Sequence, residues 1–134
     1  MRFGLGATAI GIAVTCLASP LLAHHSLEDT YDLNRTITLV GIVSRVEWVN
    51  PHARLDVDVR NANGGITTWS VELGAPNTMI RYGLGASVLR QGDQVSVDVW
   101  IAKDSSLTAS GQALRLADGR AAYVAAPWAP QSNR

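Results

Sequence analysis

Three histidines are the residues of this sequence best suited to chemistry. His24 and His25 are adjacent, and His52 follows an Asn-Pro pair. If the chain is cut before His24, that residue offers both its α-amine and its imidazole Nδ1 to one metal ion, since an α-amine is partly deprotonated near neutral pH. His25 could add a second imidazole or a backbone nitrogen. Nitrogen ligands of this kind suit Cu(II) best, so we expect a copper site made by His24, His25 and His52.

The same histidines also have a simpler interpretation. The His pair could be part of an arm that binds metals only weakly, and His52 could be a turn residue bonded to a backbone carbonyl. If the metal site exists, four carboxylates are candidates to orient its ligands, although solvated surface positions are the preferred interpretation for them. These are Glu28, Asp29, Asp32 and Glu47.

A possible ligand-binding face adds two tryptophans and two polar residues near His52. Its members are Glu47, Trp48, Asn50 and Trp100. Trp48 lies on the same face of its strand as the apolar residues at positions 40, 42 and 46, which favours a place in the core. Trp100 lies on the same face of its strand as the polar residues at positions 94, 96 and 98. This face is expected to point outward, where a large aromatic side chain is unexpected. It could stack on a ligand, but cover by the N-terminal arm or by the tail containing Trp128 is the favoured interpretation.

The first 23 residues have the pattern of a secretory signal peptide. Residues 3–23 carry no charge, Arg2 precedes them, and small residues end the run. A membrane anchor is the alternative, but glycines and a proline interrupt the run and no basic stop-transfer segment follows. We expect cleavage after Ala23, with Ala18 as the competing site. The protein is then periplasmic or secreted, and the mature chain loses the single cysteine.

Length and charge limit the remaining possibilities. A chain of 134 residues suits one domain. Its 11 Lys+Arg residues balance 11 Asp+Glu residues, which argues against a nucleic-acid binder because such proteins need a basic surface. The mature chain contains no nucleotide-binding loop, nucleophile elbow or Cys-x-x-Cys motif. We divide it into an arm over 24–35, a domain over 36–125 and a flexible tail over 126–134.

Alternation of apolar and polar residues predicts a mainly β domain. A long strand begins at Thr36, and Gly41 is a candidate bend or bulge. Residues 54–60 and 66–73 form a hairpin around the turn at 61–65, which is rich in Asn and Gly. The inward face of the first strand is expected to hold Val40, Ile42, Val46 and Trp48.

The second half of the domain has a helical connector followed by further strands. Residues 74–92 have the spacing of one or two short helices, and strands follow at 95–101 and 108–116, with a short extension at 121–124. Three strands, a helix and two strands are the order of a small five-stranded Greek-key barrel of the OB type. A β-sandwich is the alternative, but five strands are few for one.

Several segments together resemble a known family. They include His24-His25-Ser26 directly after the signal, the Trp-x-Asn-Pro-His element at 48–52, Trp69-Ser70-Val71-Glu72 and Gly74-Ala75-Pro76-Asn77. The chain resembles small secreted bacterial proteins classed as domain of unknown function 6152, and the resemblance covers nearly the whole mature chain. It implies an exported bacterial protein and implies no activity.

Three functions are therefore open. The first is an exported, non-catalytic binding module that holds copper through the three histidines. The second is a structural or protein-interaction module of the cell envelope that needs no metal. The third is a copper-dependent oxidase. It is the least favoured because the sequence offers a metal site but no recognisable substrate cleft. None of these functions involves nucleic acid or a stable membrane span after signal cleavage.

Overall fold

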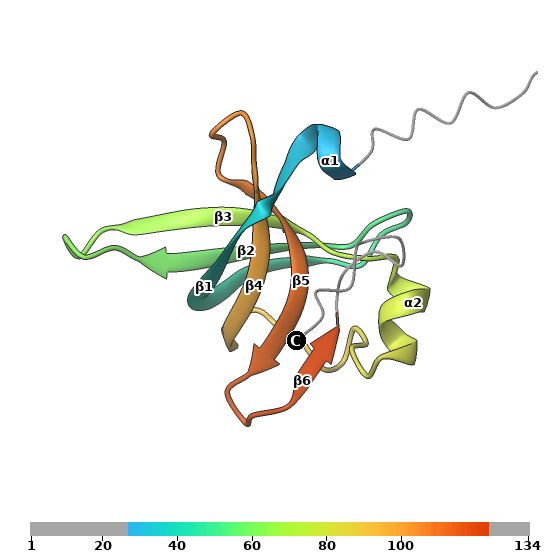
Figure 1. Cartoon of the computed structure of the whole chain (residues 1–134). Coiled ribbons are helices and arrows are strands. Elements are labelled where there is room, and N and C mark those ends of the chain that lie inside the picture. The colour runs from blue at the N-terminus through green and yellow to red at the C-terminus, as the bar shows by residue number, and fades with distance from the viewer. Residues whose placement is uncertain (1–26, 124–134) are drawn as a thin grey trace, which may run out of the picture.

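A computed structural model of the chain describes residues 27–123, which form one closed sheet with two short helices (Figure 1). Along the sheet the strand order is β3-β2-β1-β4-β5-β6, and a short parallel pairing of β3 with β5 closes the ring. The elements are α1 (Leu27–Thr30), β1 (Tyr31–Glu47), β2 (Arg54–Arg60), β3 (Ile66–Glu72), α2 (Pro76–Arg81), β4 (Gln94–Ala102), β5 (Thr108–Leu116) and β6 (Ala121–Tyr123).

The predicted fold class is confirmed. The domain is a mainly β barrel of OB-like strand order, and α2 lies between β3 and β4. The predicted extension after the fifth strand is a sixth strand, β6, which pairs with β5. The first strand begins at Tyr31 rather than at Thr36, because Tyr31 in the predicted arm pairs with Ala102 of β4, and an irregularity in the register separates this pair from the regular ladder that begins at Thr36.

The long strand β1 is shared by both halves of the barrel. It pairs with β4 from Tyr31 to Ile42 and with β2 from Ile42 to Glu47. At the crossover, a Cβ atom on Gly41 would clash with the backbone carbonyl of Asp58. Glycine is therefore required here for the close approach of two backbones. The predicted bend or bulge at Gly41 is wrong in position, since the register shift lies between Val43 and Arg45.

This bulge reverses which side chains of β1 face the core. Before it, Leu39 and Val43 are buried, whereas Val40 and Ile42 are 54% and 45% exposed. After it, the even-numbered positions pack against the core, as Val46 does. The prediction that Val40 and Ile42 face inward was wrong because it assumed uninterrupted alternation along the strand. One inserted residue moves every side chain after it to the opposite face of the sheet.

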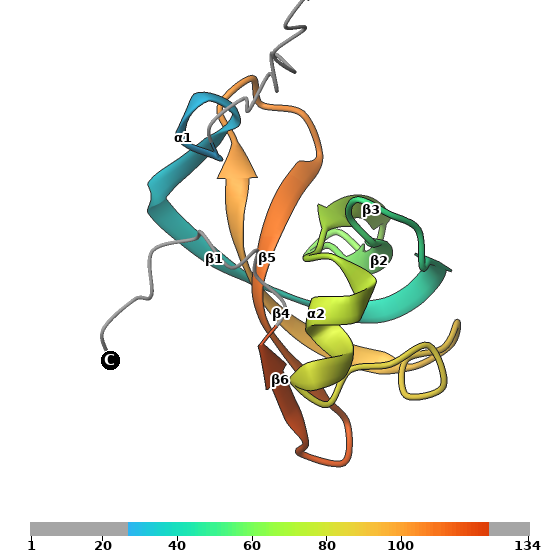
Figure 2. The ribbon, with the colours of Figure 1, turned by 90° about the vertical axis from the view of Figure 1, so that its right-hand side faces the viewer.

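The helical connector fills one end of the barrel. Met79 of α2 and two leucines that follow it, Leu84 and Leu89, are almost fully buried. They share one cluster with inward-facing strand residues such as Leu55 and Leu114. Figure 2 shows α2 beside β6, well apart from α1. Within residues 27–123, no helix has the length and apolar character needed to cross a membrane.

We predict that Gly41→Ala destabilises the protein. The added methyl group meets backbone atoms of β2, which cannot move aside as a flexible side chain would, so the free energy of unfolding should fall by about 2 kcal/mol. Gly85→Ala is the matched control, because its Cβ would meet only a side-chain atom of Ile80 at 3.8 Å. Urea unfolding measures both variants, and equal stability of the two would contradict this role of Gly41.

Candidate functional site

A hydrogen-bonded cluster forms around the carboxylate of Glu72, the last residue of β3. One of its oxygens, Oε2, accepts a hydrogen bond of 3.1 Å from the hydroxyl of Tyr31. The other, Oε1, pairs with Nδ1 of His52. The side chains of His52 and Glu72 are 29% and 33% exposed, so this pair lies at the surface while both members remain partly enclosed.

The β2–β3 hairpin places His52 beside Glu72. Arg54 at the start of β2 is the register partner of Glu72, and the ladder continues outward through backbone bonds that join Ala53 to Leu73 and Gly74. The loop that carries His52 contains a cis Asn50-Pro51 peptide bond and joins β1 to β2. The hairpin register therefore brings the loop histidine to the end of β3.

The start of β1 brings Tyr31 to the same point. Tyr31 pairs with Ala102 of β4 and is 7% exposed. It packs in a small cluster with Trp100 and Ala102, against which Leu27 and Leu33 lie. Lys103 adds two hydrogen bonds to the carbonyls of α1, from its backbone N–H to Thr30 at 3.0 Å and from Nζ to Glu28 at 2.6 Å. These contacts fix α1 to the barrel next to the cluster.

The surroundings keep the phenol of Tyr31 protonated. Burial raises its pKa above the ordinary value of 10.0, and the negative charge and hydrogen bond of Glu72 raise it further. Asp104 acts in the same direction, while Arg54 opposes it. Tyr31 is thus a permanent hydrogen-bond donor to Glu72 at physiological pH, and it holds that carboxylate toward His52.

The other residues proposed for the ligand face do not join this cluster. Glu47 pairs with Arg45 of its own strand, Trp48 packs against the core, and Asn50 is exposed in the loop. Trp100 is 4% exposed, and Leu27 and Leu33 pack against its cluster. This agrees with the expected cover of Trp100 by the protein's own chain, for which the sequence left the N-terminal arm and the tail as alternatives.

The carboxylates considered for orienting metal ligands, for which solvated surface was the preferred interpretation, lie at or near the surface. Glu28 and Asp29 are exposed, and Asp32 accepts a bond of 3.1 Å from the backbone N–H of Asn34. His24 and His25 lie outside the described residues. Among residues 27–123, no group of three His, Cys, Asp or Glu side chains is arranged to hold a metal ion.

Sequence reasoning missed Glu72 and Tyr31. A signal for Glu72 was present, because counting outward from the turn at 61–65 pairs Glu72 with Arg54, two residues after His52. The sequence gave no such signal for Tyr31, since its contact with Glu72 depends on closure of the barrel rather than on a hairpin.

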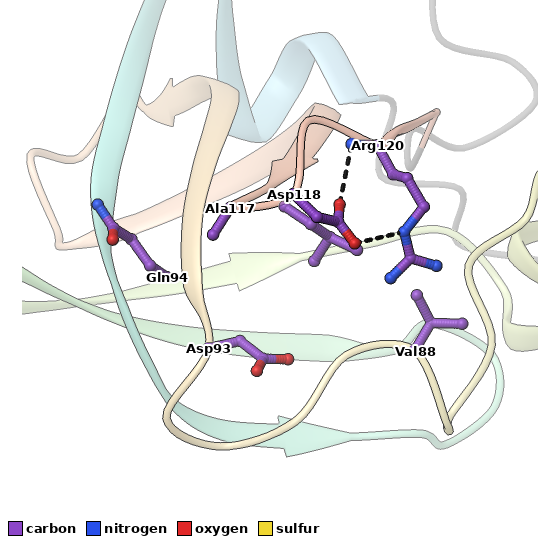
Figure 3. A pocket seen from close by; sticks show the side chains of 7 residues that line it. Val88, Asp93, Gln94, Ala117, Asp118 and Arg120 are labelled. Carbon is purple, nitrogen blue, oxygen red and sulfur yellow. Dashed lines mark hydrogen bonds and ion pairs between the residues drawn. The ribbon is translucent and has the colours of Figure 1, made fainter.

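A second feature is a depression of about 190 Å³ between the β5–β6 turn and the segment before β4. Figure 3 shows Asp118 and Arg120 on one side of it, with Asp93 and Val88 opposite. The backbone N–H and guanidinium of Arg120 bond to Asp118 and hold the pKa of that carboxyl below its usual value. Asp118 and Arg120 already pair with each other, and Asp93 accepts a hydrogen bond of 2.8 Å from the backbone N–H of Arg90. The Glu72 cluster is therefore the stronger candidate site.

Comparison with known proteins assigns the chain to a family. A protein-family model described as "Family of unknown function (DUF6152)" matches residues 12–111. The chain belongs to this family. The family resemblance found in the sequence is thereby confirmed. No curated protein and no solved structure shows significant similarity to the chain.

We predict that Tyr31→Phe changes how stability depends on alkaline pH. The pKa of Tyr31 is higher in the folded than in the unfolded state, so its stabilising contribution is complete below pH 10 and is lost as the pH rises above that value. The variant lacks this contribution, and its free energy of unfolding should fall less steeply above pH 10. At neutral pH it should lose about 1 kcal/mol with the hydrogen bond.

Urea unfolding of both proteins at neutral pH and at several alkaline pH values measures this difference. Parallel stability curves for the wild type and Tyr31→Phe would contradict the raised pKa. The remaining tyrosines are common to both proteins, so they cancel in the comparison.

Proposed function

We propose that this protein is an exported, non-catalytic binding module that holds one Cu(II) ion between its N-terminal histidines and His52. The observation that carries the proposal is the contact between Nδ1 of His52 and the carboxylate of Glu72, which Tyr31 holds in place. Metal-binding histidines in proteins nearly always use their second ring nitrogen in this way.

The carboxylate contact prepares the imidazole for a metal. A hydrogen bond from Nδ1–H to a carboxylate fixes the tautomer and the orientation of the ring and makes Nε2 a stronger ligand. The ligating nitrogen of His52 is then Nε2. A partly exposed histidine held in this manner suits a site that receives its metal from solution.

The position of α1 supports the participation of the N-terminal histidines. Leu27 packs against Tyr31 and Trp100, and Tyr31 bonds to the same Glu72 that contacts His52. His24 precedes Leu27 by three residues, a length that spans at most about 10 Å. An α-amine and imidazole from this arm, together with Nε2 of His52, would give the nitrogen-rich set that Cu(II) prefers.

An interaction module of the cell envelope is the second candidate, and one feature favours it. The β2–β3 hairpin extends beyond the barrel (Figure 1), and Ile66 at its end is 62% exposed. Only Ser70, Val71 and Glu72 of β3 pair with β5, so the outer edge near Ile66 has no strand beside it among the described residues. Such an edge can receive an extended segment of another protein.

Copper titration of the mature protein separates the two candidates. We expect protein shown by intact mass to begin at His24 to bind one equivalent of Cu(II) at submicromolar concentration. His52→Ala should weaken binding and shift the visible absorption of the complex. Glu72→Gln should weaken binding by about tenfold, the lower end of the range for residues that orient a ligand.

Glu47→Gln is the matched control, because Glu47 was also a candidate to orient the ligands but pairs with Arg45 instead. It should bind copper as the wild type does. Millimolar affinity, or a spectrum that His52→Ala leaves unchanged, would reject the copper site and favour the interaction module.

A further inference from the structure

One asparagine of the chain stands in an acceptor sequence for N-linked glycosylation. Asn34-Arg35-Thr36 has the form Asn-x-Ser/Thr with a residue other than proline in the middle. Asp32 precedes the asparagine by two residues and completes the longer form Asp/Glu-x-Asn-x-Ser/Thr, which bacterial oligosaccharyltransferases accept. No other asparagine in the sequence is followed two positions later by serine or threonine.

The strand register makes this segment leave the sheet. On β1, four residues, 32–35, lie between the pairs that Tyr31 and Thr36 make with β4, whereas on β4 only Ile101 lies between their partners. Because the extra residues cannot all pair in the ladder, the backbone bulges away between two fixed points. In Figure 1 this is the part of β1 next to α1, at one end of the barrel. A bulge of this kind lets a folded β domain offer an asparagine to an enzyme.

The side chains of the motif are open to solvent. Asn34, Arg35 and Thr36 are exposed, whereas Leu33 packs against a buried cluster and anchors the segment. Within residues 27–123, the hydrogen bond of Asn34 uses its backbone N–H, so its side-chain amide is not engaged. Oγ1 of Thr36 accepts a hydrogen bond of 3.1 Å from Nε2 of Gln112, which leaves its hydroxyl proton available to an enzyme.

We propose that Asn34 is an acceptor site for an N-linked glycan. The donor is an oligosaccharide joined through pyrophosphate to a polyprenyl lipid, and Nδ2 of Asn34 attacks the anomeric carbon of its first sugar. A C–N bond forms and the bond from that carbon to the pyrophosphate oxygen breaks. The amide gives up one proton, and the lipid pyrophosphate leaves with the electron pair of the broken bond.

The proposal rests on the export part of the proposed function and is independent of the copper site. In bacteria this transfer takes place outside the cytoplasmic membrane, where an exported chain meets the transferase. The glycan stands near an open stretch of β1, since the register gives this strand a partner in β2 only from Ile42 onward. A bulky hydrophilic group protects such an edge against pairing with another chain.

Transfer to the purified, folded protein tests the proposal. The protein is incubated with a purified bacterial oligosaccharyltransferase and its lipid-linked oligosaccharide, and intact mass measures the product. We expect one glycan per chain, at a rate within several-fold of that for a free peptide of residues 30–38. Modification of the peptide while the folded protein gains no mass would overturn the proposal. Such a failure would leave the copper site untouched, because copper plays no part in the reaction.

Variants identify the acceptor and the residues that the transferase reads. Asn34→Gln and Thr36→Ala should each abolish transfer, whereas Thr36→Ser retains the hydroxyl group and should keep most of it. Asp32→Asn should slow transfer several-fold. The matched control Asp29→Asn removes an exposed carboxylate outside the motif and should react as the wild type does. Unfolding cannot mimic these losses, because an unfolded acceptor is modified at least as readily as a folded one.

A glycan that persists in Asn34→Gln would overturn the assignment to this residue. Expression of the full sequence in a bacterium that supplies the same transferase and donor extends the test to the exported chain. Its mass reports both removal of residues 1–23 and addition of the glycan. A processed chain that carries the glycan supports the proposal, and a processed chain without it would overturn the proposal.

Discussion

The double pairing of β1 is the constraint on which the rest of the structure depends. One strand joins β4 along its first part and β2 along its last, and the two neighbours meet it at Ile42. Gly41 permits this because a larger residue would clash with the backbone of β2. The strand thereby coils around the core, and the sheet closes where β3 meets β5. Its first residue, Tyr31, and the loop after its end both reach Glu72.

The general fold was predictable because the local signals were consistent with it. The turn at 61–65 defined the hairpin, and the change from alternation to helical spacing located the connector. What failed was the inward face of β1. The bulge between Val43 and Arg45 arises from how two strands fit against β1, and no residue type in that segment marks it. Because of this bulge, Val40 and Ile42 are exposed although they are apolar.

The candidate site was predictable in part. The position of His52 in the loop after the first strand followed from the strand order, and cover of Trp100 by the protein's own chain followed from its unusual outward position. Its partner carboxylate was sought close to it in sequence, at Glu47 and in the arm. The hairpin register instead supplies Glu72, which is 20 residues away. Tyr31 could be found only from the closed barrel, because its contact depends on long-range pairing of β1 with β4.

In the proposed copper site, one metal ion joins the N-terminal arm to the loop of His52. Proton–nitrogen NMR of the mature protein with less than one equivalent of Cu(II) tests it most directly, since a paramagnetic ion broadens the amide signals of nearby residues. We expect simultaneous loss of the signals of His25 and Ser26 and of those around His52 and Glu72, while the signals of the hairpin turn at 61–65 stay unaffected. Broadening confined to the arm, with the signals of His52 and Glu72 intact, would contradict it.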